Sequence, residues 1–163
     1  MTFNEAVAAD TLGTLLPEQL PEIATNALSS GIDGSLLAAL AGESPRSASP
    51  DELHSLFNRA LAELGVERPS LTRAAEIMRD YYARRVVEGD LSPRVGAEAI
   101  VRGVLDRLEG IPRRDFVGQE LGVARLVGLF YDYEVAAEGY ATAAEVDAEV
   151  LEECRRILGA PAA

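Results

Sequence analysis

The residue pair best placed for chemistry is Asp51 and His54. Their spacing of three residues puts both side chains on one face of a helix. In helical bundles an acid and a histidine at this spacing form part of a two-metal site, which also needs a second histidine and carboxylates from further helices. His54 is the only histidine of the chain, so such a site cannot be completed. We therefore interpret Asp51 as an acid of a first helical turn, where negative charge is favoured, beside a partly exposed imidazole.

Cys154, the only cysteine, is the second candidate. It lies four residues after Val150 and four before Leu158, on the apolar stripe of a predicted helix. A reactive thiol requires a basic environment or a helix N-terminus, whereas Arg155 and Arg156 project from other faces. We predict a buried, unreactive cysteine. A single cysteine also excludes a disulfide within the chain, which agrees with a cytoplasmic location.

The third candidate is the tyrosine-rich segment from Phe130 to Tyr140. Tyrosines combine a large apolar area with a polar tip and are favoured in protein interfaces, while acidic neighbours attract a basic partner. Alternatively, the tyrosines only anchor a buried helix at its end, with their hydroxyls at the surface. The predicted partner-binding surface consists of Tyr131, Asp132, Tyr133, Glu134, Glu138 and Tyr140.

Missing residue types and motifs exclude most familiar catalytic sites. All 15 basic residues are arginine, so neither a phosphate-binding loop with its lysine nor a Schiff-base lysine can form. The chain also has no G-x-S-x-G or G-x-G-x-x-G motif. We assign no catalytic, cofactor-binding or metal-binding residue, expect no cofactor, and favour a protein that is not an enzyme.

The charge balance points to a protein partner. The chain of 163 residues has a net charge of -12. Acids outnumber arginines before residue 66 and after residue 128, and the arginines are concentrated between these positions. Binding to nucleic acid requires a basic face, so we expect none. Acidic ends favour solubility or the attraction of a basic protein.

Membrane insertion is not expected. The most apolar stretch, residues 121–131, contains Arg125 and is too short for a bilayer span. The N-terminal residues lack the basic region and apolar run of a signal peptide.

The spacing of apolar residues predicts helices throughout the chain. Ser49 with Glu52, and Thr142 with Glu145, form capping boxes that mark two helix starts. The Gly118-x-x-x-Gly122 pattern predicts a close approach of two helices. The expected helices span residues 17–29, 35–41, 50–64, 70–88, 92–108, 116–137 and 142–158.

The predicted fold class is all-α. We expect a single compact bundle of six or seven helices without a sheet, because no segment shows the alternation of a strand. The length fits one domain. Residues 1–15 and 159–163 are expected to be peripheral or flexible.

A set of motifs at helix ends runs through much of the chain. It comprises residues 20–24 followed by 31–33 and 37–42, then 57–65, 86–97, 116–118 and the closing helix 150–158. These segments resemble an uncharacterised family of small all-helical bacterial proteins. Because that family has no activity to transfer, the resemblance implies a helical fold and no function.

Charge and composition together favour a small acidic protein-binding module. We expect an adaptor, a regulatory subunit or an immunity-type inhibitor of a basic protein. The alternatives are a self-associating structural protein and a ligand-binding protein or enzyme that uses scattered carboxylates, arginines and tyrosines. The sequence leaves the partner and the oligomeric state open.

Overall fold

The computed structural model describes residues 1–44, 47–108, 118–136 and 142–159, without the side chains of residues 134–136. Within these ranges all regular secondary structure is helical and no strand occurs, so the predicted all-α fold is confirmed. The described helices slightly outnumber the six or seven predicted. None of them has both the length and the apolar composition that crossing a membrane requires.

Two compact units divide the chain, Met1–Ser70 (unit 1) and Leu71–Ala163 (unit 2), where the sequence analysis expected a single bundle. The boundary falls in the non-helical residues 65–70. This segment contains Pro69, which lacks a backbone donor and disfavours helical conformation in the residue before it. The helix before this segment therefore ends at Leu64, and a separate helix begins at Leu71.

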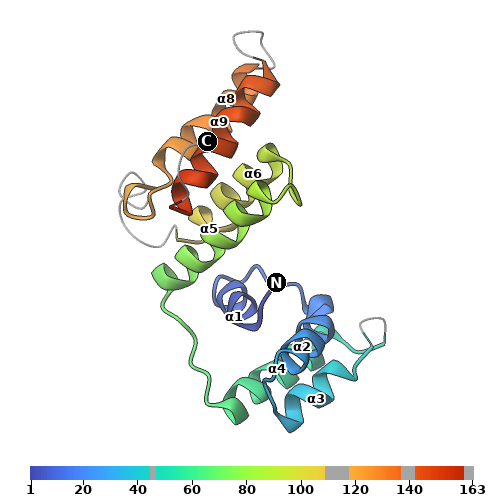
Figure 1. The fold of residues 1–163 in the computed structure, drawn as a ribbon. Coiled ribbons are helices and arrows are strands. Elements are labelled where there is room, and N and C mark those ends of the chain that lie inside the picture. The colour runs from blue at the N-terminus through green and yellow to red at the C-terminus, as the bar shows by residue number, and fades with distance from the viewer. Residues whose placement is uncertain (45–46, 109–117, 137–141, 160–163) are drawn as a thin grey trace. The chain divides into compact units, whose positions relative to one another are not determined.

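Unit 1 contains α1 (Phe3–Thr11), η1 (Pro17–Gln19), α2 (Leu20–Ser29), α3 (Ser35–Ala41) and α4 (Pro50–Leu64). Helices α2, α3 and α4 pack against one another, and α1 packs on α2 (Figure 1). The large side chains that are fully buried here are Val7, Leu20, Leu37, Leu40, Leu53 and Phe57.

The N-terminal residues belong to the core, so their predicted peripheral position is wrong. A capping box starts α1: the hydroxyl of Thr2 accepts a hydrogen bond from the Glu5 amide at 3.3 Å, and the Glu5 carboxylate accepts one from the Thr2 amide at 2.7 Å. The ring of Phe3 then meets Phe57 of α4 edge-on, with 6.1 Å between the centroids. Leu12 and Leu15 are also buried. The same start signal that predicts the helix at Ser49 is thus present at Thr2.

The N-terminus of α3 is capped by a different helix. Its N-cap residue is Gly34, which has no side chain to accept the amide hydrogens. The carboxylate of Glu63, on α4, accepts hydrogen bonds from the Ser35 amide at 3.1 Å, the Ser35 hydroxyl at 2.5 Å and the Leu36 amide at 2.8 Å. These hydrogen bonds, above all that from the Ser35 side chain, lower the pKa of Glu63. A negative charge is therefore held at the positive end of the α3 dipole.

Unit 2 contains α5 (Leu71–Val87), α6 (Pro93–Gly103), η2 (Leu105–Leu108), α8 (Ala124–Ala136) and α9 (Ala143–Ile157). Helix α9 packs on α5, α6 and α8, and α6 packs on both α5 and α8 (Figure 1). The predicted capping boxes at the starts of α4 and α9 are both present. Fully buried large side chains here are Met78, Ile100, Val104, Leu121, Leu126 and Glu153.

Helices α5 and α6 approach each other closely at Gly96. A Cβ atom added to this glycine would lie 2.0 Å from Cγ2 of Val86 on α5, whereas Cβ of Val86 would be at 3.5 Å. Both residues are buried. The absence of a side chain at Gly96 is thus what allows the Val86 methyl to pack directly on the backbone of α6.

The Gly118-x-x-x-Gly122 pattern ends a helix, so the predicted close helix packing at this site is wrong. The amide of Gly122 donates to the carbonyl of Gln119 at 3.0 Å, and that of Val123 donates to the carbonyl of Gly118 at 2.8 Å. This pair of bonds is a Schellman turn, which requires a residue with positive φ, and Gly122 has φ of 67°. The single helix predicted over residues 116–137 is therefore interrupted, and α8 begins only at Ala124.

Candidate functional site

The structure separates the predicted partner surface on α8 into exposed and buried residues. Tyr131 is 53% exposed and Asp132 is also exposed, as a contact surface requires. Tyr133 is only 5% exposed. Glu138, Tyr140 and the side chain of Glu134 lie outside the described residues.

Tyr133 is a residue of the core of unit 2. Its hydroxyl donates a hydrogen bond to Oδ1 of Asp147 on α9 at 2.6 Å, and the guanidinium of Arg94 on α6 lies 5.5 Å from its ring centroid. Burial, followed by the hydrogen bond to Asp147, raises the pKa of the Tyr133 phenol. Tyr133 joins three helices, and the alternative interpretation of an anchoring tyrosine describes it better than that of a partner contact.

Tyr131 is the exposed member of an aromatic pair. Its ring packs edge-on against that of Phe130, with 5.4 Å between the centroids. The guanidinium of Arg102 on α6 lies 5.5 Å from the Phe130 centroid and 3.5 Å from the carboxylate of Glu98. Among the described residues of the predicted surface, Tyr131 and Asp132 are thus the exposed ones, and the ring of Phe130 supports that of Tyr131.

A cleft of about 590 Å³ lies beside the first half of α4 in unit 1. It has an apolar part formed by Ala48, Leu53 and Leu56, and a polar rim. We call it the acidic cleft because, among the described residues that line it, three are carboxylates and one is a cation. The polar residues of the lining are Glu43, Ser47, Asp51, Glu52, Ser55 and Arg59.

The carboxylates of the acidic cleft differ in whether hydrogen bonds within the chain hold them in place. Glu52 is tied into the capping box of α4, since it accepts hydrogen bonds from the amide of Ser49 at 2.9 Å and from its hydroxyl at 2.8 Å. The backbone hydrogen bond from Ser49 is the main reason that the pKa of Glu52 is lowered. Glu43 and Asp51 are exposed to solvent. Asp51 and Glu52 also lie in the first turn of α4, where the helix dipole favours their negative charge.

The sequence signal for the acidic cleft was a serine- and proline-rich loop directly before a capping box. In the sequence this segment comprises residues 43–49, directly before the acids Asp51 and Glu52. Such a loop indicates a flexible connection, but it says nothing about which side chains it will face. Glu43, Ser47 and Ala48 line the cleft together with residues of α4, a proximity that the sequence pattern does not encode.

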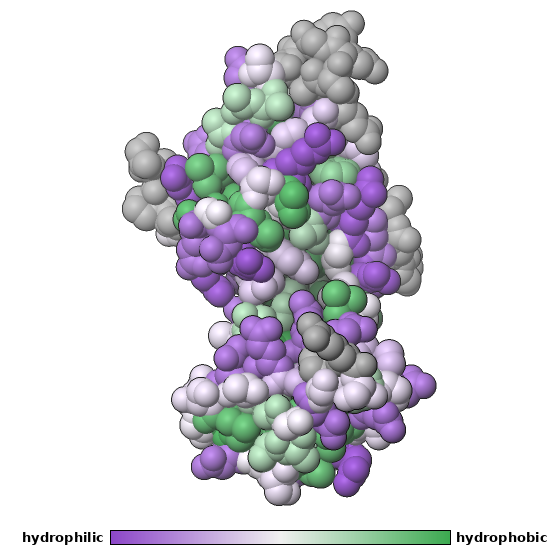
Figure 2. All heavy atoms as spheres, turned by 90° about the vertical axis from the view of Figure 1, so that its right-hand side faces the viewer, coloured by the Kyte–Doolittle hydropathy of each residue, from purple (hydrophilic) through white to green (hydrophobic). Residues whose placement is uncertain are grey.

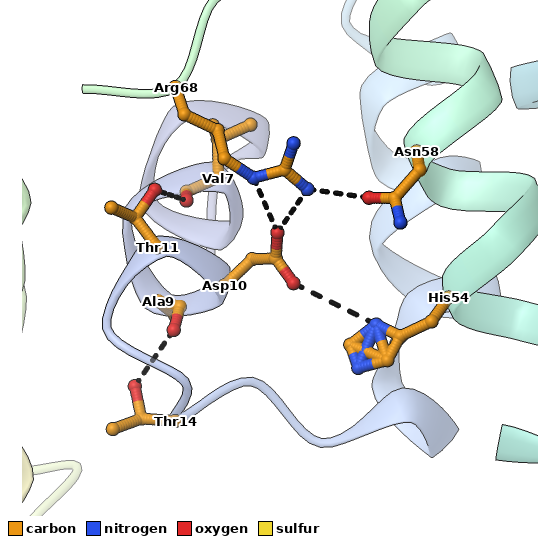
Figure 3. Close-up of polar contacts among 8 residues, drawn as sticks. All are labelled: Val7, Ala9, Asp10, Thr11, Thr14, His54, Asn58 and Arg68. Atoms are coloured by element: carbon orange, nitrogen blue, oxygen red, sulfur yellow. Dashed lines mark hydrogen bonds and ion pairs between the residues drawn. The ribbon is translucent and has the colours of Figure 1, made fainter. Parts of the chain in front are cut away.

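His54 faces an aspartate other than the one predicted. Its Nδ1 lies 3.7 Å from Oδ1 of Asp10, at the end of α1 (Figure 3). The neighbouring Asp51 instead lines the acidic cleft. His54 is therefore part of a contact between α1 and α4.

Asp10 is the centre of a polar cluster in unit 1. Its Oδ2 accepts hydrogen bonds from Nε of Arg68 at 3.0 Å and from Nη2 at 2.6 Å. The same Nη2 donates to Oδ1 of Asn58 at 2.5 Å (Figure 3). The Asp10 side chain is only 11% exposed, whereas that of Arg68 is 43% exposed. We call Asp10, His54, Asn58 and Arg68 the Asp10 cluster.

Cys154 is fully buried, as predicted. Burial, together with the adjacent charge of Glu153, raises the pKa of its thiol to about 12. The thiolate, which is the nucleophile, is therefore scarce at neutral pH.

Glu153 is a buried carboxylate that sequence reasoning missed. It accepts hydrogen bonds from Nε of Arg156 at 2.9 Å and from Nη2 at 2.6 Å, and Nη1 of Arg125 lies 3.8 Å from it. The same Nη2 of Arg156 donates to the carbonyl of Gly122 at 2.6 Å. Glu153 therefore orients Arg156 to hold the turn that precedes α8, which is a structural task.

Hydrophilic side chains cover most of the visible face of each unit, and apolar side chains reach it in small patches (Figure 2). Among the residues that the structure describes, no group of three or more histidine, cysteine, aspartate or glutamate side chains could hold a metal ion. Comparison of the chain with protein-family models, with curated proteins and with solved structures found no match.

Proposed function

We propose that the protein is a small acidic protein-binding module, and that the acidic cleft of unit 1 receives an arginine or lysine side chain of a basic partner. The observation that supports this is the composition of the cleft, which is lined by both apolar side chains and carboxylates. Arginine and lysine have an apolar stem and a cationic head, so both parts find a complementary surface. An arginine head can in addition bind a carboxylate through two parallel hydrogen bonds.

The charge around the cleft favours such a partner. The described residues of the lining include three carboxylates and one guanidinium, that of Arg59. The chain as a whole carries a net charge of -12, which accelerates the encounter with a basic protein and repels an acidic one. An adaptor, a regulatory subunit and an immunity-type inhibitor all fit this chemistry.

Tyr131 and Asp132 form a second predicted contact, on unit 2. Tyr131 would supply the apolar anchor there, because its ring is exposed and held by Phe130. This contact is tested separately, with Tyr131→Ala.

The proposal can be tested by amide NMR titration with a short arginine-containing peptide at about 0.15 M salt, where contacts between distant surface charges are screened. The control peptide carries neutral citrulline in place of arginine. We expect the arginine peptide to shift amide resonances along the first half of α4 and the citrulline peptide to shift few. The double variant Glu43→Gln/Asp51→Asn should lose most of the binding, and Glu22→Gln, an exposed acid on α2 outside the cleft, should keep it.

Equal shifts with both peptides, or equal binding by both variants, would show that the cleft does not recognise the cation. If binding is confirmed, the wild-type chain and the double variant serve as matched baits, and a basic protein retained by the former alone identifies a partner. Sedimentation of the chain by itself tests the self-association alternative. A dimer that dissociates in Glu43→Gln/Asp51→Asn would mean that an arginine of a second copy fills the cleft.

A further inference from the structure

The Asp10 cluster contains an acid in a position that its own helix does not favour. Asp10 lies in the last turn of α1, near the negative end of the helix dipole, and that turn has no basic residue. A carboxylate is destabilising there unless cations from elsewhere compensate it. One such cation is present, since Arg68 binds one oxygen of the Asp10 carboxylate, while the ring of His54 faces the other oxygen. Asp10 therefore contributes through its contacts with Arg68 and His54, and it does not stabilise helix α1 itself.

Arg68 comes from the segment that leaves unit 1. Helix α4 ends at Leu64 and α5 begins at Leu71, and the residues between them form no helix. Near the start of this segment, the amide of Val66 donates to the carbonyl of Leu61 at 2.9 Å. Two residues later, Arg68 reaches back to α1 through Asp10 and to α4 through Asn58.

We propose that Asp10 is a clasp that fixes the segment Val66–Arg68 on unit 1 through the guanidinium of Arg68. The clasp fixes the point at which the connecting segment leaves unit 1. Beyond Arg68, the remainder of this segment begins at Pro69. Pro69 suits this role, since its ring fixes its own φ and restricts Arg68 to an extended conformation. His54 and Asn58 are positioning residues, which hold Asp10 and Arg68 in the orientation of the contact.

The burial of the carboxylate supports this role. Most ion pairs between two exposed side chains contribute little, because water and salt compete with them. Asp10 is only 11% exposed, and it receives two charge-assisted hydrogen bonds from a single guanidinium. Loss of the clasp should therefore release residues 66–68 without unfolding the helices, since the segment itself forms none.

Cleavage of the native full-length chain by a glutamate-specific protease tests the clasp. The protease can cut after Glu67, which is exposed inside the clasped segment, and after Glu43, which is exposed in the loop before α4 and serves as the internal reference. We expect Asp10→Asn to raise the ratio of Glu67 to Glu43 cleavage about fivefold, the population change that a partly exposed ion pair supports. Asp33→Asn, an exposed acid of the same unit, is the matched control and should leave the ratio unchanged.

A second variant keeps the test decisive if Asp10→Asn disturbs the fold. Cleavage at Glu18 and Glu22, in η1 and α2, would report such unfolding of unit 1. In that case Arg68→Gln decides, because it removes the cation from an exposed, non-helical position. Because the substitution lies next to the cleavage site, the rate of cleavage after Glu67 is divided by the rate for a synthetic peptide of residues 63–72 that carries the same substitution. If this normalised rate, relative to cleavage after Glu43, equals that of the wild type, the proposal is overturned. An increase of the size expected for Asp10→Asn would support it.

Discussion

The close approach of α5 and α6 gives a prediction whose magnitude follows from the structure. Replacing Gly96 with alanine places a methyl group 2.0 Å from Cγ2 of Val86, far inside van der Waals contact. Val86 is buried and β-branched, so its χ1 cannot rotate freely away. Overpacking of a core costs about 1–3 kcal/mol, whereas alanine gains about 1 kcal/mol over glycine within a helix. We expect Gly96→Ala to lower the stability of unit 2 by up to about 2 kcal/mol, the difference between these two effects.

Removal of the opposing methyl groups should reverse the sign. In a Val86→Ala background the nearest remaining Val86 atom is Cβ, at 3.5 Å from the added methyl, which is an ordinary contact. Gly96→Ala should then be neutral or stabilise by up to about 1 kcal/mol. The two substitutions are thus coupled, and the double-mutant cycle should give a coupling energy of about 1–3 kcal/mol.

Tyrosine fluorescence is the assay of choice, because all five tyrosines belong to unit 2 and the chain has no tryptophan. Urea unfolding followed by this signal reports on unit 2 alone. Gly128→Ala is the matched control: it lies within α8, and an added Cβ atom would meet nothing within 4 Å. It should therefore raise the stability by about 1 kcal/mol. If Gly96→Ala also raises it in the wild-type background, α5 and α6 do not meet as described.

Three further predictions concern Cys154, Tyr133 and the two glutamates of the capping boxes. Cys154 should react with Ellman's reagent only as fast as unit 2 opens, because burial raises its pKa to about 12; rapid labelling of the native chain at neutral pH would contradict its burial. Tyr133→Phe should lower the free energy of unfolding in urea by about 1 kcal/mol, because Asp147 loses a partly buried hydrogen bond. No change would mean that water replaces this bond. The capping boxes lower the pKa values of Glu52 and Glu145 from 4.5, so the stability that these carboxylates contribute is present above pH 4.5 and is lost as the pH falls through their folded-state pKa values. The melting temperature of the double variant Glu52→Gln/Glu145→Gln should therefore depend less on pH in this range. A pH profile equal to that of the wild type would refute the assignment.

Local signals in the sequence were sufficient for most helix boundaries. Helix α3 spans residues 35–41 and α4 spans residues 50–64, as predicted. The start of α4 follows from Ser49, Pro50 and Glu52, and its end from Gly65, which has φ of 65°. These signals act between residues a few positions apart, so they can be interpreted without knowledge of the rest of the chain. The same reasoning predicted the burial of Cys154, from its place on an apolar stripe.

The limits of sequence reasoning appear where an acidic side chain or a tyrosine has several possible partners. Tyr131 and Tyr133 belong to the same helix and differ by only two residues, yet one is exposed and the other is buried against α9. Two residues correspond to about 200° of helical rotation, which places their side chains on nearly opposite faces. Periodicity therefore indicates that they differ, but the packing of α6 and α9 on α8 decides which of them is covered.

Residue types and local spacing in the sequence determine the helical class, the helix ends and the acidic character of this chain. Tertiary structure alone decides the pairing of distant residues: Glu63 caps a helix that begins 28 residues earlier, and Asp10 binds Arg68 across 58 residues. The acidic cleft likewise combines Glu43, Ser47 and Ala48 with side chains from the first half of α4. The physical reason is that a cap or an apolar stripe is satisfied within one or two helical turns, whereas a carboxylate pairs with whichever donor the packing of the helices brings within about 3 Å.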